Sequence, residues 1–111
     1  MADDVARAVV RRAHAHELCA GHFPGDPLVP GAYLTGLMAE LAALYVQRTR
    51  PRARLVAIDE AGFARRVVPD EPIVIECRAP RGDDDPLRAD AVVYSAGVRA
   101  ARARLRFGEP S

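Results

Sequence analysis

The stretch that decides the fold runs from Pro30 to Val46 and reads PGAYLTGLMAELAALYV. Its larger apolar side chains recur at spacings of three and four residues, which predicts an α-helix over 32–46. They belong to Leu34, Leu37, Met38, Leu41, Leu44 and Tyr45. Because alanines fill much of the opposite side, we expect the helix to be apolar nearly all round and buried in the centre of the domain.

After the helix the apolar spacing changes to two, which is typical of strands. In the last such run arginines alternate with apolar residues, so this strand should have one solvated and one buried face. Residues 95–97 are expected to join the last two strands as a tight hairpin, and 69–72 and 83–86 to form turns. The predicted strands are 55–58, 73–77, 91–94 and 101–107.

Residues 5–15 precede the helix and predict a first strand, whereas the glycines and prolines of 21–31 exclude regular structure and predict an ordered loop. The order is then strand, loop, helix and four strands in a meander. An α+β fold, with an antiparallel sheet wrapped around one central helix, is the simplest packing. We expect residues 1–111 to form a single domain.

Composition limits the classes of function. The chain has 111 residues and a formal net charge of +1, so it lacks the basic excess of proteins that bind nucleic acid independently of sequence. Alanine accounts for 21 residues, and because alanine buries little surface, we expect the domain to gain stability as a homodimer or higher oligomer. All 16 basic residues are arginine, which is typical of a GC-rich genome.

Cys19 and Cys77 are isolated in the sequence and form no CxxC pair, so neither a zinc site nor a disulfide framework is indicated. No segment has the apolar length of a membrane span, and the acidic start of the chain does not fit a signal peptide. The sequence therefore predicts a cytoplasmic protein that binds no membrane.

The loop Gly21–Gly31, GHFPGDPLVPG, resembles the motif of the β-hydroxyacyl-acyl carrier protein dehydratases, FabZ- and FabA-like enzymes with the hot-dog fold. The likeness continues through 55–63 (LVAIDEAGF) and 67–70 (VVPD). It implies a hydro-lyase of fatty-acid or polyketide-type metabolism. The substrate would be held on the phosphopantetheine of acyl carrier protein or on CoA, with no other cofactor and no metal.

By the same resemblance, His22 would be the base that removes the α-proton, and a neutral imidazole suits that task at neutral pH. The backbone N–H of Gly31, at the positive end of the helix dipole, would hold the thioester oxygen. Phe23, Pro30 and Tyr33 would lie around the substrate, although an aromatic residue on a helix, such as Tyr33, more often belongs to the core.

The resemblance fails at the catalytic acid. The family places a Glu or Asp fourteen residues after the histidine, where this chain has Gly36. Glu40 lies one turn further along the same helix face, about 6 Å along the axis, and is the candidate substitute acid. The alternative is that Glu40 is a buried or interfacial residue paired with an arginine.

For the remaining arginines and histidines the sequence supports only weaker hypotheses about function. Arg65 and Arg66 are candidates for contact with a phosphopantetheine phosphate or with an acidic carrier protein. Arg102, Arg104 and Arg106 are interpreted as a solvated face. His14 and His16 share a strand face, but two histidines without a third ligand make a weak metal site.

Three functions are compared. The first is a dehydratase that uses His22 and Gly31. The second, prompted by Gly36, is a thioesterase-like enzyme or a non-dehydrating, acyl-binding subunit of a hot-dog heterodimer. The third, a structural or nucleic-acid-binding module, has only small size in its favour. The pathway, the acyl chain length and the stereochemistry cannot be read from the sequence.

Overall fold

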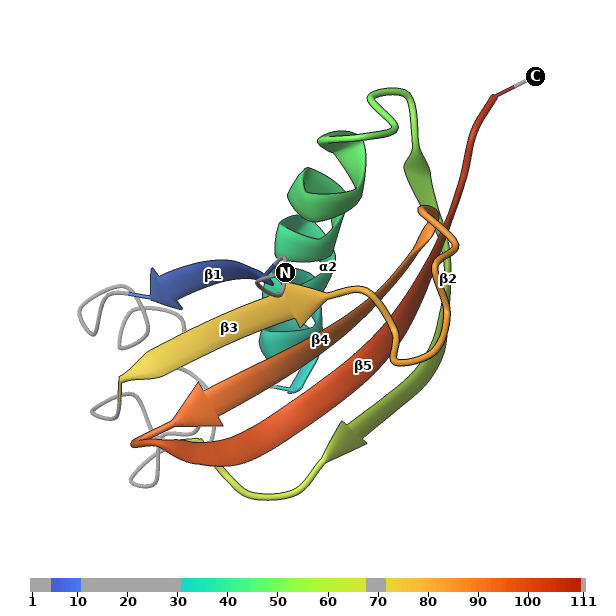
Figure 1. Cartoon of the computed structure of the whole chain (residues 1–111). Helices are drawn as coiled ribbons and strands as arrows, with labels where there is room; N and C mark the ends of the chain where they lie inside the picture. Colours follow the sequence, from blue (N-terminus) through green and yellow to red (C-terminus); the bar gives the residue numbers. More distant parts are fainter. Residues whose placement is uncertain (1–4, 11–30, 68–71, 111) are drawn as a thin grey trace.

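The computed structural model describes residues 5–10, 31–67 and 72–110, which form one five-stranded antiparallel sheet and one helix. Figure 1 shows the helix, α2 (Gly31–Gln47), lying against one face of a strongly curved sheet. The strands are β1 (Val5–Val10), β2 (Arg54–Phe63), β3 (Ile73–Arg78), β4 (Arg88–Ser95) and β5 (Val98–Gly108). The predicted α+β class and the sheet wrapped around a helix are confirmed.

The order of the strands differs from the predicted meander. Within the described residues the order is β1-β3-β4-β5-β2, so only β3, β4 and β5 follow one another as neighbours. The strand after the helix, β2, pairs with the last strand, β5, and becomes an edge of the sheet. The meander prediction was wrong because it assumed that strands consecutive in the chain also pair, which holds only in most cases.

The hairpin between β4 and β5 forms as predicted. Ala96 and Gly97 occupy its tip with φ of 52° and 79°, respectively. Two successive positive φ angles are typical of the two-residue turns whose twist matches that of paired strands. Glycine adopts this conformation without strain, whereas Ala96 is held in it by the pairing of Ser95 with Val98.

One face of α2 builds the core against the sheet. Leu34, Met38, Leu41, Ala42 and Val46 are buried on this face. Beneath them the sheet presents alternating residues, many of them alanines, whose small side chains let the helix approach closely. The buried sheet residues are Ile73, Ile75, Cys77, Ala89, Ala91, Val93, Ser95, Ala100, Ala101, Ala103, Leu105 and Phe107.

The opposite face of α2 is exposed. Ala32, Gly36, Glu40 and Leu44 recur every four residues along it, and Leu44 is 65% exposed. The prediction that the helix is buried nearly all round is therefore wrong for the single chain. The sheet covers one face of the helix only, and the second face is left uncovered by the described residues.

Candidate functional site

The helix begins at Gly31, the position that the sequence predicted for the oxyanion donor. The N–H groups of a first helical turn have no acceptor within the helix, and the helix dipole places partial positive charge there. The first turn of α2 contains no acidic residue that would neutralise this charge. The N-terminus of α2 can therefore donate hydrogen bonds to a carbonyl oxygen that gains negative charge.

Phe63, the last residue of β2, covers this N-terminus. A Cβ atom added at Gly31 would lie 3.4 Å from the Cε1 and Cζ atoms of the Phe63 ring. Phe63 is 52% exposed, so its ring contacts the helix on one side and remains accessible on the other. In the sequence, Phe63 was only part of the family likeness over 55–63, and it was not predicted to belong to the site. The one signal in the sequence was a large aromatic residue at the end of a strand.

Arg65 and Arg66 follow Phe63 at the same end of β2. The backbone N–H groups of Ala64 and Arg65 donate to the carbonyl oxygen of Ala100, at 2.8 and 3.4 Å, and fix this segment on β5. Arg65 is half-buried and its Nε donates to the carbonyl oxygen of Arg66, whereas Arg66 is exposed. Both residues that were predicted to contact the carrier protein thus lie within three positions in sequence of Phe63, whose ring covers Gly31.

Gly36 and Glu40 both lie on the exposed face of α2. A Cβ atom at Gly36 would meet nothing within 4 Å, so the space that the family fills with an acid is open here. Glu40 is exposed, and its side chain makes no ion pair or hydrogen bond within the described residues. The interpretation of Glu40 as a buried residue paired with an arginine is therefore wrong for the single chain, and its pairing at an interface stays a prediction.

Tyr33 is half-buried and packs against the core, as the second interpretation of this residue expected. The other predicted site residues, His22, Phe23 and Pro30, lie outside the described residues, as do His14 and His16. Gly31, Phe63, Arg65 and Arg66 are accordingly the part of the candidate site that the structure brings together.

Within residues 5–10, 31–67 and 72–110, no three His, Cys, Asp or Glu side chains lie close enough to hold a metal ion. The one helix of this part of the chain is too short to cross a membrane. Cys77 is a buried free thiol on β3. Burial raises its pKa from 9.0 to about 12, with a smaller contribution from the charge of Asp90, so it is protonated at neutral pH.

A sequence model described as ApeI-like, ApeI dehydratase, matches residues 2–97. The chain belongs to the ApeI-like dehydratase family. Among curated relatives, it is 35% identical over 91 residues to the 3-hydroxyacyl-[acyl-carrier-protein] dehydratase FabZ of Pelotomaculum thermopropionicum, covering 78% of this chain and 65% of that protein. It is 38% identical over 71 residues to the enzyme of the same name from Bordetella petrii, covering 55% and 47%. The chain thus spans about half to two thirds of these relatives.

Solved structures of low sequence identity share the fold. A chain of the dehydratase heterocomplex ApeI:P from Xenorhabdus doucetiae superposes with a TM-score of 0.70 at 16% identity, covering 96% of this chain and 88% of that one. The (R)-hydratase of A. caviae gives a TM-score of 0.66 at 16% identity, covering 97% and 96%. A Thermus thermophilus thioesterase gives 0.65 at 18%, covering 96% and 78%. The predicted hot-dog fold and family are confirmed.

Proposed function

We propose that this ApeI-like protein removes water from β-hydroxyacyl thioesters carried on acyl carrier protein or CoA. The observation that carries the proposal is the family match over residues 2–97, which includes a helix that begins at the glycine of the family motif. The relatives FabZ are named for this reaction on acyl carrier protein. The N-terminus of α2, whose partial positive charge is not neutralised by any acidic residue of the first turn, can stabilise the negative charge that develops on the thioester oxygen.

The proposed reaction divides three tasks among the residues. The imidazole of His22 takes the α-proton, and the electron pair moves onto the thioester oxygen, where the N–H of Gly31 stabilises the negative charge. The electron pair then forms the α,β double bond as the β-carbon to oxygen bond breaks. The leaving hydroxyl accepts a proton from an acid and departs as water.

We assign the acid to Glu40. Its carboxyl group is exposed and without an ion pair among the described residues, and the Gly36 position one turn away is open. A carboxyl group that is not paired with an arginine can hold a proton and donate it to the leaving hydroxyl of a bound substrate. The exposed face of α2 that carries it would be covered in a dimer, which would exclude water from the reaction.

Such a dimer would form through β2. This strand is a sheet edge, and its backbone groups on the side away from β5 have no strand partner within the described residues. Four of the seven large apolar residues that are exposed in the described part of the chain belong to it: Leu55, Val56, Ile58 and Phe63. A long apolar edge strand is a template for pairing with another chain. We propose a homodimer in the cytoplasm, with Arg65 and Arg66 meeting the carrier.

Turnover assays test the dehydratase proposal. The purified protein, given a β-hydroxyacyl thioester of acyl carrier protein or of CoA, should form the enoyl thioester, and His22→Ala should abolish it. Full turnover by His22→Ala, or no enoyl product from the wild-type protein with any chain length, contradicts the assignment. Hydrolysis to the free acid in place of elimination supports the thioesterase-like alternative.

A second candidate is a non-dehydrating subunit of a heterodimer. Gly36, which stands where the family has its acid, favours it, and one structural neighbour is a chain of a dehydratase heterocomplex. In that case a partner chain would complete the site. Because Gly36 faces open space, the Gly36→Glu variant should fold. If the wild-type homodimer shows no dehydratase activity, this variant should show it. No gain in the folded variant counts against a missing acid as the cause.

A further inference from the structure

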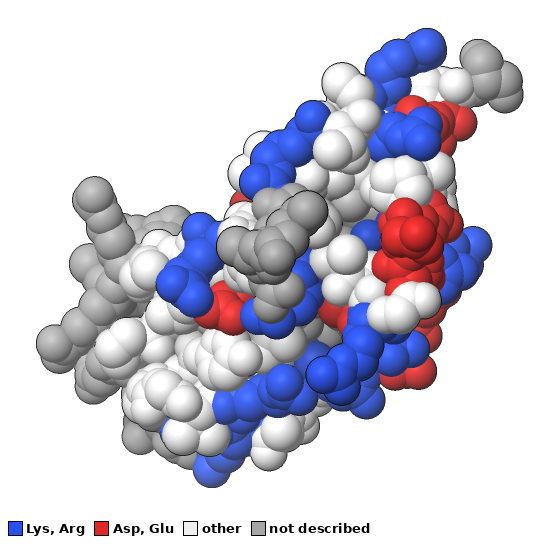
Figure 2. Space-filling model, in the orientation of Figure 1, with Lys and Arg blue, Asp and Glu red and all other residues white. Residues whose placement is uncertain are grey.

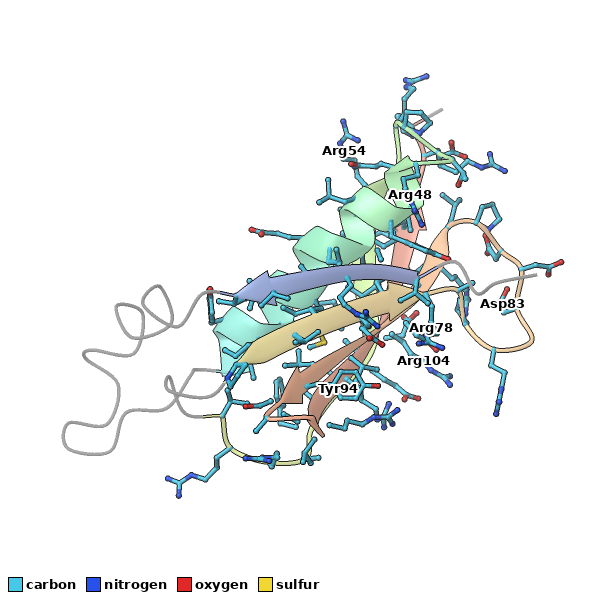
Figure 3. The ribbon with its side chains drawn as sticks, turned by 60° about the vertical axis from the view of Figure 1, so that its left-hand side comes forward. Arg48, Arg54, Arg78, Asp83, Tyr94 and Arg104 are labelled. Atoms are coloured by element: carbon cyan, nitrogen blue, oxygen red, sulfur yellow. The ribbon has the colours of Figure 1, made fainter. Side chains whose placement is uncertain are left out.

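A groove of about 440 Å³ crosses the face of the sheet that points away from α2, outside the candidate site. It runs over β3, β4 and β5, and four arginines contribute to its lining: Arg78, Arg99, Arg102 and Arg104. Figure 2 shows basic side chains as a band across this face, with acidic atoms gathered toward one side. Figure 3 shows Arg78, Tyr94 and Arg104 on neighbouring strands of the same face.

The strand register arranges this surface in rows. In the first row Asp90 lies between Arg78 and Arg104. In the second, Val92 lies between Glu76 and Arg102, and in the third, Tyr94 lies between Val74 and Arg99. Directly opposed residues have Cβ atoms about 5 Å apart, so each row is continuous across the three strands.

The groove therefore has a partly apolar floor with charged walls. Val92 and Tyr94 on β4 are half-buried and form its middle, and the arginines of β5 follow one side. Tyrosine and arginine are enriched in protein interfaces, where an apolar centre is surrounded by a polar rim. The arrangement resembles a binding surface, whereas the sequence alone led to the interpretation of Arg102, Arg104 and Arg106 as a solvated face.

The excess of basic over acidic side chains in the lining of the groove favours an acidic partner. Four arginines face two acidic residues, Glu76 and Asp90, in the lining of the groove. The side chain of Arg99 makes no ion pair or hydrogen bond within the described residues, and the Nε of Arg104 lies 3.9 Å from Asp90, beyond hydrogen-bond distance. The side chain of Arg104 is 61% exposed. These two guanidinium groups can bind carboxylates without first breaking a close internal pair.

Spacing favours a helical partner. Arginines two positions apart on β5, Arg102 and Arg104, lie about 6.8 Å apart along the strand. Carboxylates four positions apart on an α-helix rise about 6 Å. A helix lying along β5 could thus place successive glutamates or aspartates against successive arginines and an apolar residue against Val92 and Tyr94. Arg102 is paired with Glu60 at 3.0 Å, but both side chains are about half exposed, so a carboxylate of the partner can replace Glu60 at low cost.

We propose that this groove docks an acidic amphipathic helix of a partner protein. The site lies on the face of the sheet opposite α2, so the partner can bind while the N-terminus of α2 is occupied. Guanidinium–carboxylate contacts would orient the helix, and the apolar floor would contribute burial. The proposal does not depend on the dehydratase reaction.

Binding of a synthetic peptide tests the proposal on the full chain. The probe is an amphipathic helix with a glutamate at every fourth position and leucines beside them, and its control carries glutamine in place of glutamate. NMR of isotope-labelled protein should show shift changes centred on residues 92, 94, 99 and 102, and the affinity should fall as salt is raised. Absence of binding, equal binding of the glutamine peptide, or shifts confined to α2 overturns the proposal.

Charge reversal locates the interaction. Arg99→Glu should weaken binding of the peptide about tenfold, because it places like charges in contact, and Arg99→Lys should retain most of it. Arg52→Glu is the matched control, since Arg52 is an exposed arginine outside the groove and its variant carries the same net charge. An equal loss in Arg52→Glu would show a nonspecific effect of net charge and overturn the proposed site. Tighter binding of single-stranded RNA or of anionic vesicles, abolished by Arg99→Glu, would assign the groove to another class of partner.

Discussion

The ring of Phe63 packs over the backbone of Gly31, at the point where the helix begins and where the thioester oxygen is proposed to bind. The contact joins the last residue of the edge strand β2 to the first residue of α2, which are separated in sequence by the whole length of the helix and of the strand. A Cβ atom at Gly31 would lie 3.4 Å from the ring, which is van der Waals contact, so the ring borders the space that a side chain at this position would occupy.

Gly31→Ala tests this contact. The added methyl group would touch the ring of Phe63 and occupy the space next to the proposed oxyanion donor, while alanine at the first helical turn costs no helix propensity. We expect unchanged or slightly higher thermal stability and a fall in enoyl formation of about tenfold or more. Full activity would show that the substrate does not approach this side of Gly31.

Glu40→Gln tests the assignment of the acid. Glutamine keeps the size of the side chain and removes the transferable proton, so enoyl formation should fall about 100-fold while the fold is retained. Circular dichroism and thermal melting serve as the fold control, because the side chain is exposed. If Glu40→Gln turns over substrate at the wild-type rate, the acid is another residue or belongs to a partner chain.

Gly36→Ala should make the protein more stable. Glycine in the middle of a helix costs up to about 1 kcal/mol relative to alanine, and a Cβ atom at this position meets nothing within 4 Å in the single chain. Denaturant unfolding should therefore give a higher midpoint with an unchanged slope. If the variant is less stable, or forms no dimer, position 36 is covered closely by a second chain.

Val56→Lys tests association through β2. Val56 is 60% exposed on this edge strand, so a lysine should be tolerated in the monomer and should oppose pairing of two β2 strands. Sedimentation analysis should show a shift from dimer toward monomer. Val9→Lys is the matched control, because Val9 is 67% exposed on β1, the opposite edge of the sheet. If only Val9→Lys causes dissociation, the dimer interface lies at β1 and not at β2.

Cys77 should be inert in the folded protein and should make stability depend on pH at the alkaline end. Its folded pKa of about 12 lies above the ordinary value of 9.0, so the folded state retains a proton that the unfolded state loses between these values. The contribution of the Cys77 thiol to the free energy of unfolding is fully present below pH 9 and is lost as the pH rises toward 12. Alkylation followed by peptide mapping should modify Cys77 only after denaturation. Rapid labelling at neutral pH in native buffer would contradict its burial.

Elements whose signals are local in the sequence were predicted most accurately. The helix was predicted within one residue at each end, because its apolar period and the preceding Pro-Gly pair are contained in the segment itself. The strand β2 was predicted only over 55–58, yet it continues to Phe63. Its second half, 59–63, begins with two acidic residues and contains no β-branched residue. It is held as a strand by β5, where Arg106 pairs with Asp59 and Arg102 pairs with Glu60, both at 3.0 Å.

The candidate site was predictable to the extent that it follows the family motif. Gly31 was placed at the start of the helix, and the structure confirms this position. The contact of Phe63 with Gly31 depends on the pairing of β2 with β5, which no local pattern specifies. The groove on the outer face was missed for a similar reason, because its arginines and Tyr94 belong to three strands whose register is a property of the whole sheet.

The order of the strands also has a consequence for folding during synthesis. Because β2 pairs only with β5 within the described residues, it has no partner until some forty further residues have left the ribosome. Its apolar residues remain accessible through that interval, and contacts between segments far apart in sequence form slowly. Early pairing of β2 with the nascent β2 of a neighbouring chain would protect these residues, whereas a chaperone would have to cover them if the protein were synthesised as isolated copies.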